Sequence, residues 1–170
     1  MGIRTCDPER LVQSLSARPA EASDAGHRGA LALSDLRRRR RREVVELVLE
    51  RAGRLPEDER DLLSSVLAEG RSIAEVARIR GEPARSTSRR VHRIVARVLC
   101  PLFAYASQQM DGWPRRRRRI ADATVIRGLS LRAAAQELGE TVWAVRRERE
   151  KIRDLFEGAR TVSEKLRSAG

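Results

Sequence analysis

Arginines recur every four residues in the segment 84–99, and their chemistry suits nucleic acid. They are Arg85, Arg89, Arg93 and Arg97. In a helix this spacing places them along one slowly turning stripe. A guanidinium group bonds bidentately to phosphate and to the edge of guanine. Because the segment contains no acid, the stripe predicts a helix that binds DNA, although a solvated surface face is the alternative interpretation.

The two sides of this predicted helix should have different roles. We expect its first turns to enter the major groove, because a recognition helix contacts base edges with its N-terminal residues. The residues expected near base edges are Arg85, Ser86, Arg89 and Arg90, and those expected near phosphates are Arg93 and Arg97. The residues expected to pack inside are Thr87, Val91, Ile94, Val95 and Val98.

A second basic cluster consists of five consecutive arginines at 115–119. They stand at the start of a predicted helix, where the helix dipole disfavours cations unless an anion offsets them. We therefore expect phosphate contacts there, and the candidate DNA-binding residues of this half are Arg115, Arg116, Arg117 and Arg147. Four acids lie within 142–157. We expect this half to contribute nonspecific affinity for the DNA backbone, or to bind a protein partner through Trp143. We expect the Trp143 side chain to be half-buried.

The composition favours a polyanionic partner and disfavours catalysis. The 170 residues hold 36 Lys and Arg against 24 Asp and Glu, a net charge of +12, which attracts phosphates. The two cysteines and two histidines form no cluster, so we expect no enzyme, metal site, cofactor or small-molecule substrate. Five aromatic residues are too few for single-strand stacking. Without an apolar membrane span or a secretory signal, the expected location is the cytoplasm, in association with the nucleoid.

The sequence repeats itself at an offset of 58 residues, between segments that begin at Leu55 and Trp113. The matched pairs are Pro56/Pro114, Arg60/Arg118, Gly70/Gly128, Ser72/Ser130, Ala77/Ala135, Gly81/Gly139 and Ile94/Ile152. They fall at predicted helix starts, turns and buried positions, where backbone geometry limits the choice of residue. We interpret the repeat as a duplication.

Each repeat predicts three helices. The first repeat gives 56–69, 73–80 and 84–99, and the second gives 114–127, 130–138 and 141–157, with Gly158 ending the last helix. A short helix, a glycine turn and a longer helix are typical of a helix-turn-helix. No segment alternates with a period of two residues. The predicted fold is therefore all-α, with tandem three-helix helix-turn-helix units that lack wings and follow a basic helix.

The predicted domain organisation follows from these elements. It comprises a flexible tail at 1–30, a basic amphipathic helix at 34–53, a first unit at 55–100, a linker at 101–112, a second unit at 113–158 and a C-terminal tail at 159–170. Cys100, at the end of the first unit, is expected to be a packing residue.

Two stretches resemble region 4 of bacterial sigma-70-type factors. They are LPEDERDLLSSVLAEGRSIAEVARIRG at 55–81 and GLSLRAAAQELG at 128–139. The resemblance, which covers roughly 55–158, implies a recognition helix that reads the promoter −35 element and a domain that touches the β-flap of RNA polymerase. The departures from the family pattern are Arg80, Glu82, Thr87 and Arg149, the last at a normally buried position. No upstream segment resembles region 2.

The sequence thus predicts a sequence-specific, double-stranded DNA-binding transcription regulator that reads the major groove with helix 84–99. Two alternatives stay open. One is an interaction module that docks on RNA polymerase or a sigma factor, and the other is a nonspecific nucleoid or RNA-binding protein. The exposed face of helix 84–99 should separate DNA reading from protein docking, because a protein-docking face carries apolar anchors. A titration with random and selected duplex DNA should separate sequence-specific from nonspecific binding.

Overall fold

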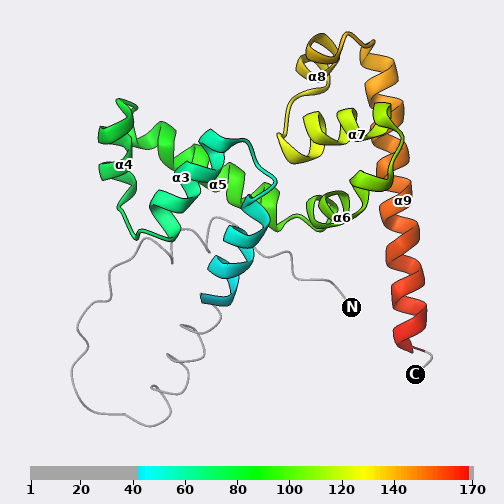
Figure 1. Cartoon of the computed structure of the whole chain (residues 1–170), viewed down its shortest axis with the longest axis horizontal. Coiled ribbons are helices and arrows are strands. Elements are labelled where there is room, and N and C mark those ends of the chain that lie inside the picture. Colours follow the sequence, from blue (N-terminus) through cyan, green and yellow to red (C-terminus); the bar gives the residue numbers. More distant parts are fainter. Residues whose placement is uncertain (1–41, 169–170) are drawn as a thin grey trace. The chain divides into compact units, whose positions relative to one another are not determined.

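The fold is all-α, as predicted. The computed structural model describes residues 42–168 (Figure 1), and no strand occurs among them. The described residues form two compact units, one from 42–53 and 57–96 and the other from 54–56 and 97–168. The predicted tail 1–30, and the start of the predicted helix 34–53, lie outside the described residues. Within 42–168, no helix is long and apolar enough to cross a membrane.

The first unit contains a helix over 42–52 followed by α3 (Glu57–Leu67), α4 (Ile73–Arg80) and most of α5 (Ala84–Leu99). The last residues of α5, 97–99, belong to the second unit. Glu57, Asp58 and Glu59 open α3, where acids interact favourably with the helix dipole. The interior residues come from all four helices and include Val48, Ala52, Leu62, Leu63, Val76, Ala77, Val91 and Ile94. This core fixes α5 against the rest of its unit.

The predicted inner face of α5 is confirmed. Its members are all buried, with exposed fractions of 0 or 1%: Thr87, Val91, Ile94, Val95 and Val98. Thr87 is a polar residue in this row, and its hydroxyl donates to the backbone carbonyl of Pro83 at 3.3 Å. Such a partner reduces the desolvation cost of a buried hydroxyl. The inner face fixes the rotation of α5 about its axis and therefore decides which residues lie on its outer side.

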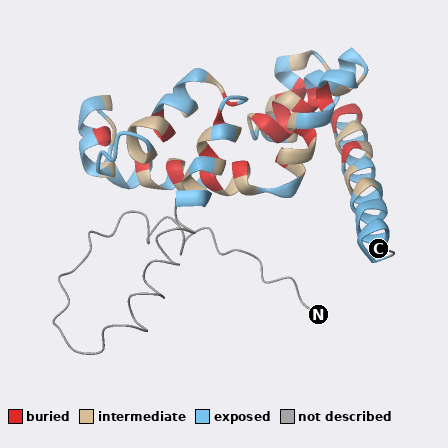
Figure 2. Cartoon of the chain, turned by 60° about the horizontal axis from the view of Figure 1, so that its bottom comes forward, coloured by how far each residue is buried: buried red, intermediate tan, exposed pale blue. Residues whose placement is uncertain are grey.

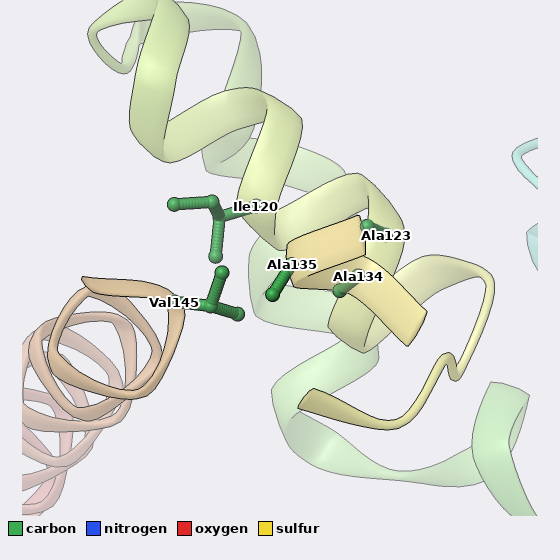
Figure 3. Close-up of a cluster of buried hydrophobic side chains, with 5 residues drawn as sticks. All are labelled: Ile120, Ala123, Ala134, Ala135 and Val145. Atoms are coloured by element: carbon green, nitrogen blue, oxygen red, sulfur yellow. The ribbon is translucent and has the colours of Figure 1, made fainter. Parts of the chain in front are cut away.

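The second unit contains α6 (Pro101–Gln109), α7 (Arg115–Ala121), α8 (Leu131–Leu138) and α9 (Val142–Ser168). A short 3-10 turn, η1 (Met110–Gly112), precedes α7, and a π-helical turn, η2 (Asp122–Ile126), continues it. Figure 3 shows the side chains that meet at the centre of this unit, namely Ile120, Ala123, Ala134, Ala135 and Val145. Small alanines on α8 let the neighbouring helices approach closely.

Local backbone geometry recurs at the 58-residue offset. Ser72 and Ser130 cap α4 and α8, each accepting a bond of 3.2 Å from the backbone NH three residues later. Gly81 and Gly139 close these helices with φ values of 66° and 68°. The amide of Glu82 bonds to the carbonyl of Ala77 at 2.9 Å, and Glu140 repeats that bond to Ala135 at the same distance. Equal caps and turns give both halves the same order of short helix, left-handed turn and longer helix.

Two predicted boundaries are wrong. The segment 101–112 is not a linker, because α6 begins at Pro101 and buries Phe103 and Ala106 completely. Proline fits the first turn of a new helix, where no amide donor is needed. Gly158 does not end the last helix either, since α9 continues to Ser168. The ion pairs of Arg160 with Glu157 and Glu164 join turns on both sides of that region, which supports the helix.

The end of α9 extends beyond the packed part of the second unit. Residues 160–168 are all exposed, as the pale blue turns near the C-terminus show in Figure 2. The part of α9 that packs inside includes Val145 and Ile152, which are fully buried. The segment 159–168, predicted as part of a C-terminal tail at 159–170, is therefore a helical extension of α9.

Candidate nucleic-acid interface

The outer face of α5 carries exposed arginines. Arg85, Arg89 and Arg93 are exposed together with Ser86. No ion pair between these arginines and an acid occurs within 42–168. The four-residue spacing gives them one side of the helix, opposite the buried row. Their guanidinium donors therefore face solvent, and an external acceptor can reach them.

Arg90 differs from these three arginines, because it is bound inside its own unit. It forms an ion pair with Asp58 of α3 and lies 3.6 Å from Glu82. Arg80 shares both acids. The bonds from Arg80 and Arg90 to Asp58 lower the pKa of that carboxyl group, so Asp58 stays charged at neutral pH. This network ties α3 to the turn before α5 and to α5 itself, and it occupies a guanidinium that the sequence analysis assigned to a base edge.

Arg97 also leaves the predicted stripe. Its Nη1 donates to the backbone carbonyl of Arg127 at 2.8 Å, and its side chain is partly buried. Carbonyls at the end of a helix favour a cation. The stripe predicted from spacing is therefore exposed from Arg85 to Arg93, while its last member packs within the second unit.

The arginines at 115–119 fall into two groups. Arg116 pairs with Glu140 at 2.7 Å, and Arg117 pairs with Glu148 at 3.2 Å. The bonds to Arg116 lower the pKa of Glu140, and bonds from Lys151 and then Arg117 lower the pKa of Glu148. The other three, Arg115, Arg118 and Arg119, are exposed. The repulsion expected at this helix start is thus offset in part by the protein's own acids.

In each unit an ion pair joins the first helix to the third helix, but the acid and the base exchange places between the two units. Asp58 of α3 corresponds at the 58-residue offset to Arg116 of α7, and Arg90 of α5 corresponds to Glu148 of α9. In the first unit an acid on the first helix binds a base on the third helix. In the second unit a base on the first helix, Arg117, binds the acid on the third. The exchange places one acid, Glu148, on α9 where α5 has Arg90.

Trp143 is exposed and not half-buried as expected. It is 66% exposed, and the guanidinium of Arg147 lies 5.2 Å from the centre of its ring. This contact is a cation–π interaction. Arg147, a predicted DNA-binding residue, is exposed as well, and the two side chains form one small patch on the first turns of α9. Cys100, predicted to pack, is also exposed.

Four acids decide which arginines face outward, and none of them was predicted from the sequence. They are Asp58, Glu82, Glu140 and Glu148. Their partners lie up to 32 residues away, so no local pattern indicates them. One signal was present, because the repeat aligns the oppositely charged residues Asp58 and Arg116.

The comparisons with known proteins add no identification. No protein family, curated protein or solved structure was found to match the chain. Within residues 42–168, no group of three or more His, Cys, Asp or Glu side chains could hold a metal ion.

Proposed function

We propose that the protein is a sequence-specific, double-stranded DNA-binding transcription regulator, with α5 as its major-groove reader. The observation that carries this proposal is the exposed face of α5, where Arg85, Arg89 and Arg93 have no acidic partner among residues 42–168. Arginine bonds bidentately to guanine O6 and N7, and phosphate contacts supply affinity. Ser86, exposed at the start of the same face, is a further donor to bases.

The backbone before α5 supports the same proposal. A capped eight-residue helix, a left-handed Gly81 and a 16-residue helix have the order of a helix-turn-helix. The resemblance of 55–81 to sigma region 4 adds the expectation of a promoter element as target and of RNA polymerase as a neighbouring partner. Apolar anchors, which a protein-docking face would need, are absent from the exposed described residues of α5 between Arg85 and Arg93.

A second function is favoured by one separate observation on α9. Trp143 and Arg147 are residue types enriched at the energetic centres of protein interfaces, and both are exposed. We therefore assign α9 a protein-docking role, with RNA polymerase or a sigma factor as the expected partner class, while α5 contacts DNA.

The DNA-binding proposal is tested with charge-matched variants. Duplexes are selected from a random library with the full chain, and affinities are measured by fluorescence anisotropy. Replacing Arg85, Arg89 and Arg93 by Ala should weaken binding to the selected duplex by about tenfold or more. The control replaces three exposed arginines of the second unit, Arg132, Arg146 and Arg153, and removes the same net charge. Equal losses for both variants would mean that charge alone drives binding, and would contradict sequence reading by α5.

A further inference from the structure

The exposed end of α9 carries a row of apolar side chains. Leu155, Val162 and Leu166 are 40%, 58% and 71% exposed, and Ala159 lies between the first two in the row. Together with the buried Ile152, these residues are separated by three, four, three and four positions. This alternation is the heptad pattern of a coiled coil, whose apolar positions form a seam along one side of a helix. We call Leu155, Ala159, Val162 and Leu166 the α9 seam.

The ion pairs of the same segment lie on the other side of the helix. Arg160 pairs with Glu157 at 3.7 Å and with Glu164 at 3.4 Å. Because each helical residue turns by about 100°, these three side chains stand roughly opposite the α9 seam. The pairs therefore stabilise the helix while the apolar row stays in contact with water. A partner helix that covered the row would gain the free energy of burying it.

The α9 seam fits a second copy of itself in the antiparallel orientation. When Ala159 is placed opposite the partner's Val162, Leu155 comes opposite the partner's Leu166, and two-fold symmetry repeats both pairs. A small residue then faces a larger one in each central layer, and two leucines meet at each end, so every layer is filled. A parallel pair would instead set Ala159 against its own copy and leave a gap in that layer.

The charges beside the seam favour the same arrangement. Residues 152–168 hold four basic and three acidic side chains, so two copies of this segment repel each other only weakly. In the antiparallel register Lys165 stands across from the partner's Gly158, and the partner's Asp154 lies one turn further along the same side. Two-fold symmetry gives this attraction twice. The parallel register brings no acid beside Lys165.

We propose that the end of α9 is a homodimerisation surface, where the α9 seam of one chain packs antiparallel against that of a second copy. The helix is anchored in its unit by the buried Val145 and Ile152, so association orders little additional chain. Because the seam covers only about two heptads, we expect a weak dimer with a Kd in the micromolar range. The association is measured without DNA, so its failure would leave the DNA-binding proposal standing.

The first test measures the oligomeric state of the full chain by sedimentation equilibrium across the micromolar range. Combining Val162→Asp with Leu166→Asp puts two charges into the seam and should raise the Kd of the dimer about tenfold or more. The matched control, Thr161→Asp with Ser168→Asp, adds the same charges at exposed positions of α9 away from the seam and should dimerise like the unmodified protein. Equal dissociation of both variants, or an unmodified protein that stays monomeric up to several hundred micromolar, would overturn the proposal.

Cysteine cross-linking tests the antiparallel register. In a background with Cys6 and Cys100 replaced by Ser, Ala159→Cys and Val162→Cys are made as separate variants. Oxidation by copper phenanthroline should cross-link their equimolar mixture severalfold faster than either variant alone, because only facing residues come close enough for a disulfide. Each variant cross-linking alone as fast as the mixture would contradict the antiparallel register. Cross-linking no faster than that of Thr161→Cys would contradict the seam itself.

Discussion

The side chain of Arg97 lies directly against Gly128. A Cβ atom at residue 128 would stand 2.6 Å from Nη1 and 2.9 Å from Cδ of Arg97. Gly128 has a φ of 66°, and Gly139 in the same unit has nearly the same value, 68°, with no neighbour within 4 Å of a Cβ there. Alanine substitutions at Gly128 and Gly139 therefore separate the free-energy cost of a left-handed alanine from the cost of displacing an arginine side chain.

Gly128→Ala should therefore destabilise the protein more than Gly139→Ala. A left-handed alanine costs about 1–2 kcal/mol at either position, and residue 128 adds the displacement of Arg97 from its bond to Arg127. The measurement is urea unfolding of both variants. Combining Gly128→Ala with Arg97→Ala should remove most of the difference. Equal losses for the two single variants would show that Arg97 moves aside without cost.

Asp58 should contribute to stability through its two arginine partners. Asp58→Asn removes the ion pairs with Arg80 and Arg90, and because the Asp58 side chain is 56% exposed, we expect a loss of about 0.5–1 kcal/mol. Asp61→Asn is the control, since it changes an exposed acid on the same helix and should alter the unfolding free energy little. A loss of the same size in the control would indicate an effect on the α3 dipole instead.

The same ion pairs predict a pH dependence. Because bonds from Arg80 and Arg90 lower the pKa of Asp58 below its ordinary 3.8, the folded state holds the proton less tightly than the unfolded state. The stabilisation is complete above the ordinary value and disappears as the pH falls through the folded pKa. Between about pH 6 and pH 2, Tm should therefore fall more steeply for the unmodified protein than for Asp58→Asn. Parallel curves would contradict the lowered pKa.

The exposed arginines before α7 should determine part of the salt dependence of DNA binding. Replacing Arg115, Arg118 and Arg119 by Ala should weaken binding to all duplexes about equally. It should reduce the slope of log affinity against log salt by about 0.9 for each lost phosphate contact, or about 2.7 for three. The charge-matched variant of Arg132, Arg146 and Arg153 serves as the comparison. A preserved slope with loss of only the preferred sequence would make the second unit a base reader.

Locally determined features could be predicted from the sequence. The helices 73–80 and 84–99 begin and end as expected, because Ser72, Gly81 and Pro101 act on their immediate neighbours. The buried row of α5 followed from a 3.6-residue period. The internal repeat indicated the paired caps and left-handed glycines at the same offset.

The side-chain environment could not be predicted in the same way. Arg89 and Arg90 are adjacent in sequence, but Asp58, 32 residues away, binds Arg90 alone. Residues 101–109 form a helix whose Phe103 side chain is buried in the core. The continuation of α9 past Gly158 is supported by the ion pairs of Arg160 with Glu157 and Glu164. These outcomes depend on contacts that form only in the folded chain.

Methylation interference on a selected duplex tests the central claim, that the exposed face of α5 reads the major groove, most directly. Methylating guanine N7 blocks an acceptor that arginine uses in that groove. We predict interference at one or more guanines for the unmodified protein, and loss of one of these signals in Arg89→Ala, with the signals kept in the Arg153→Ala control. The account would be contradicted by a selected site where guanine N7 methylation has no effect, or where Arg89→Ala keeps every signal.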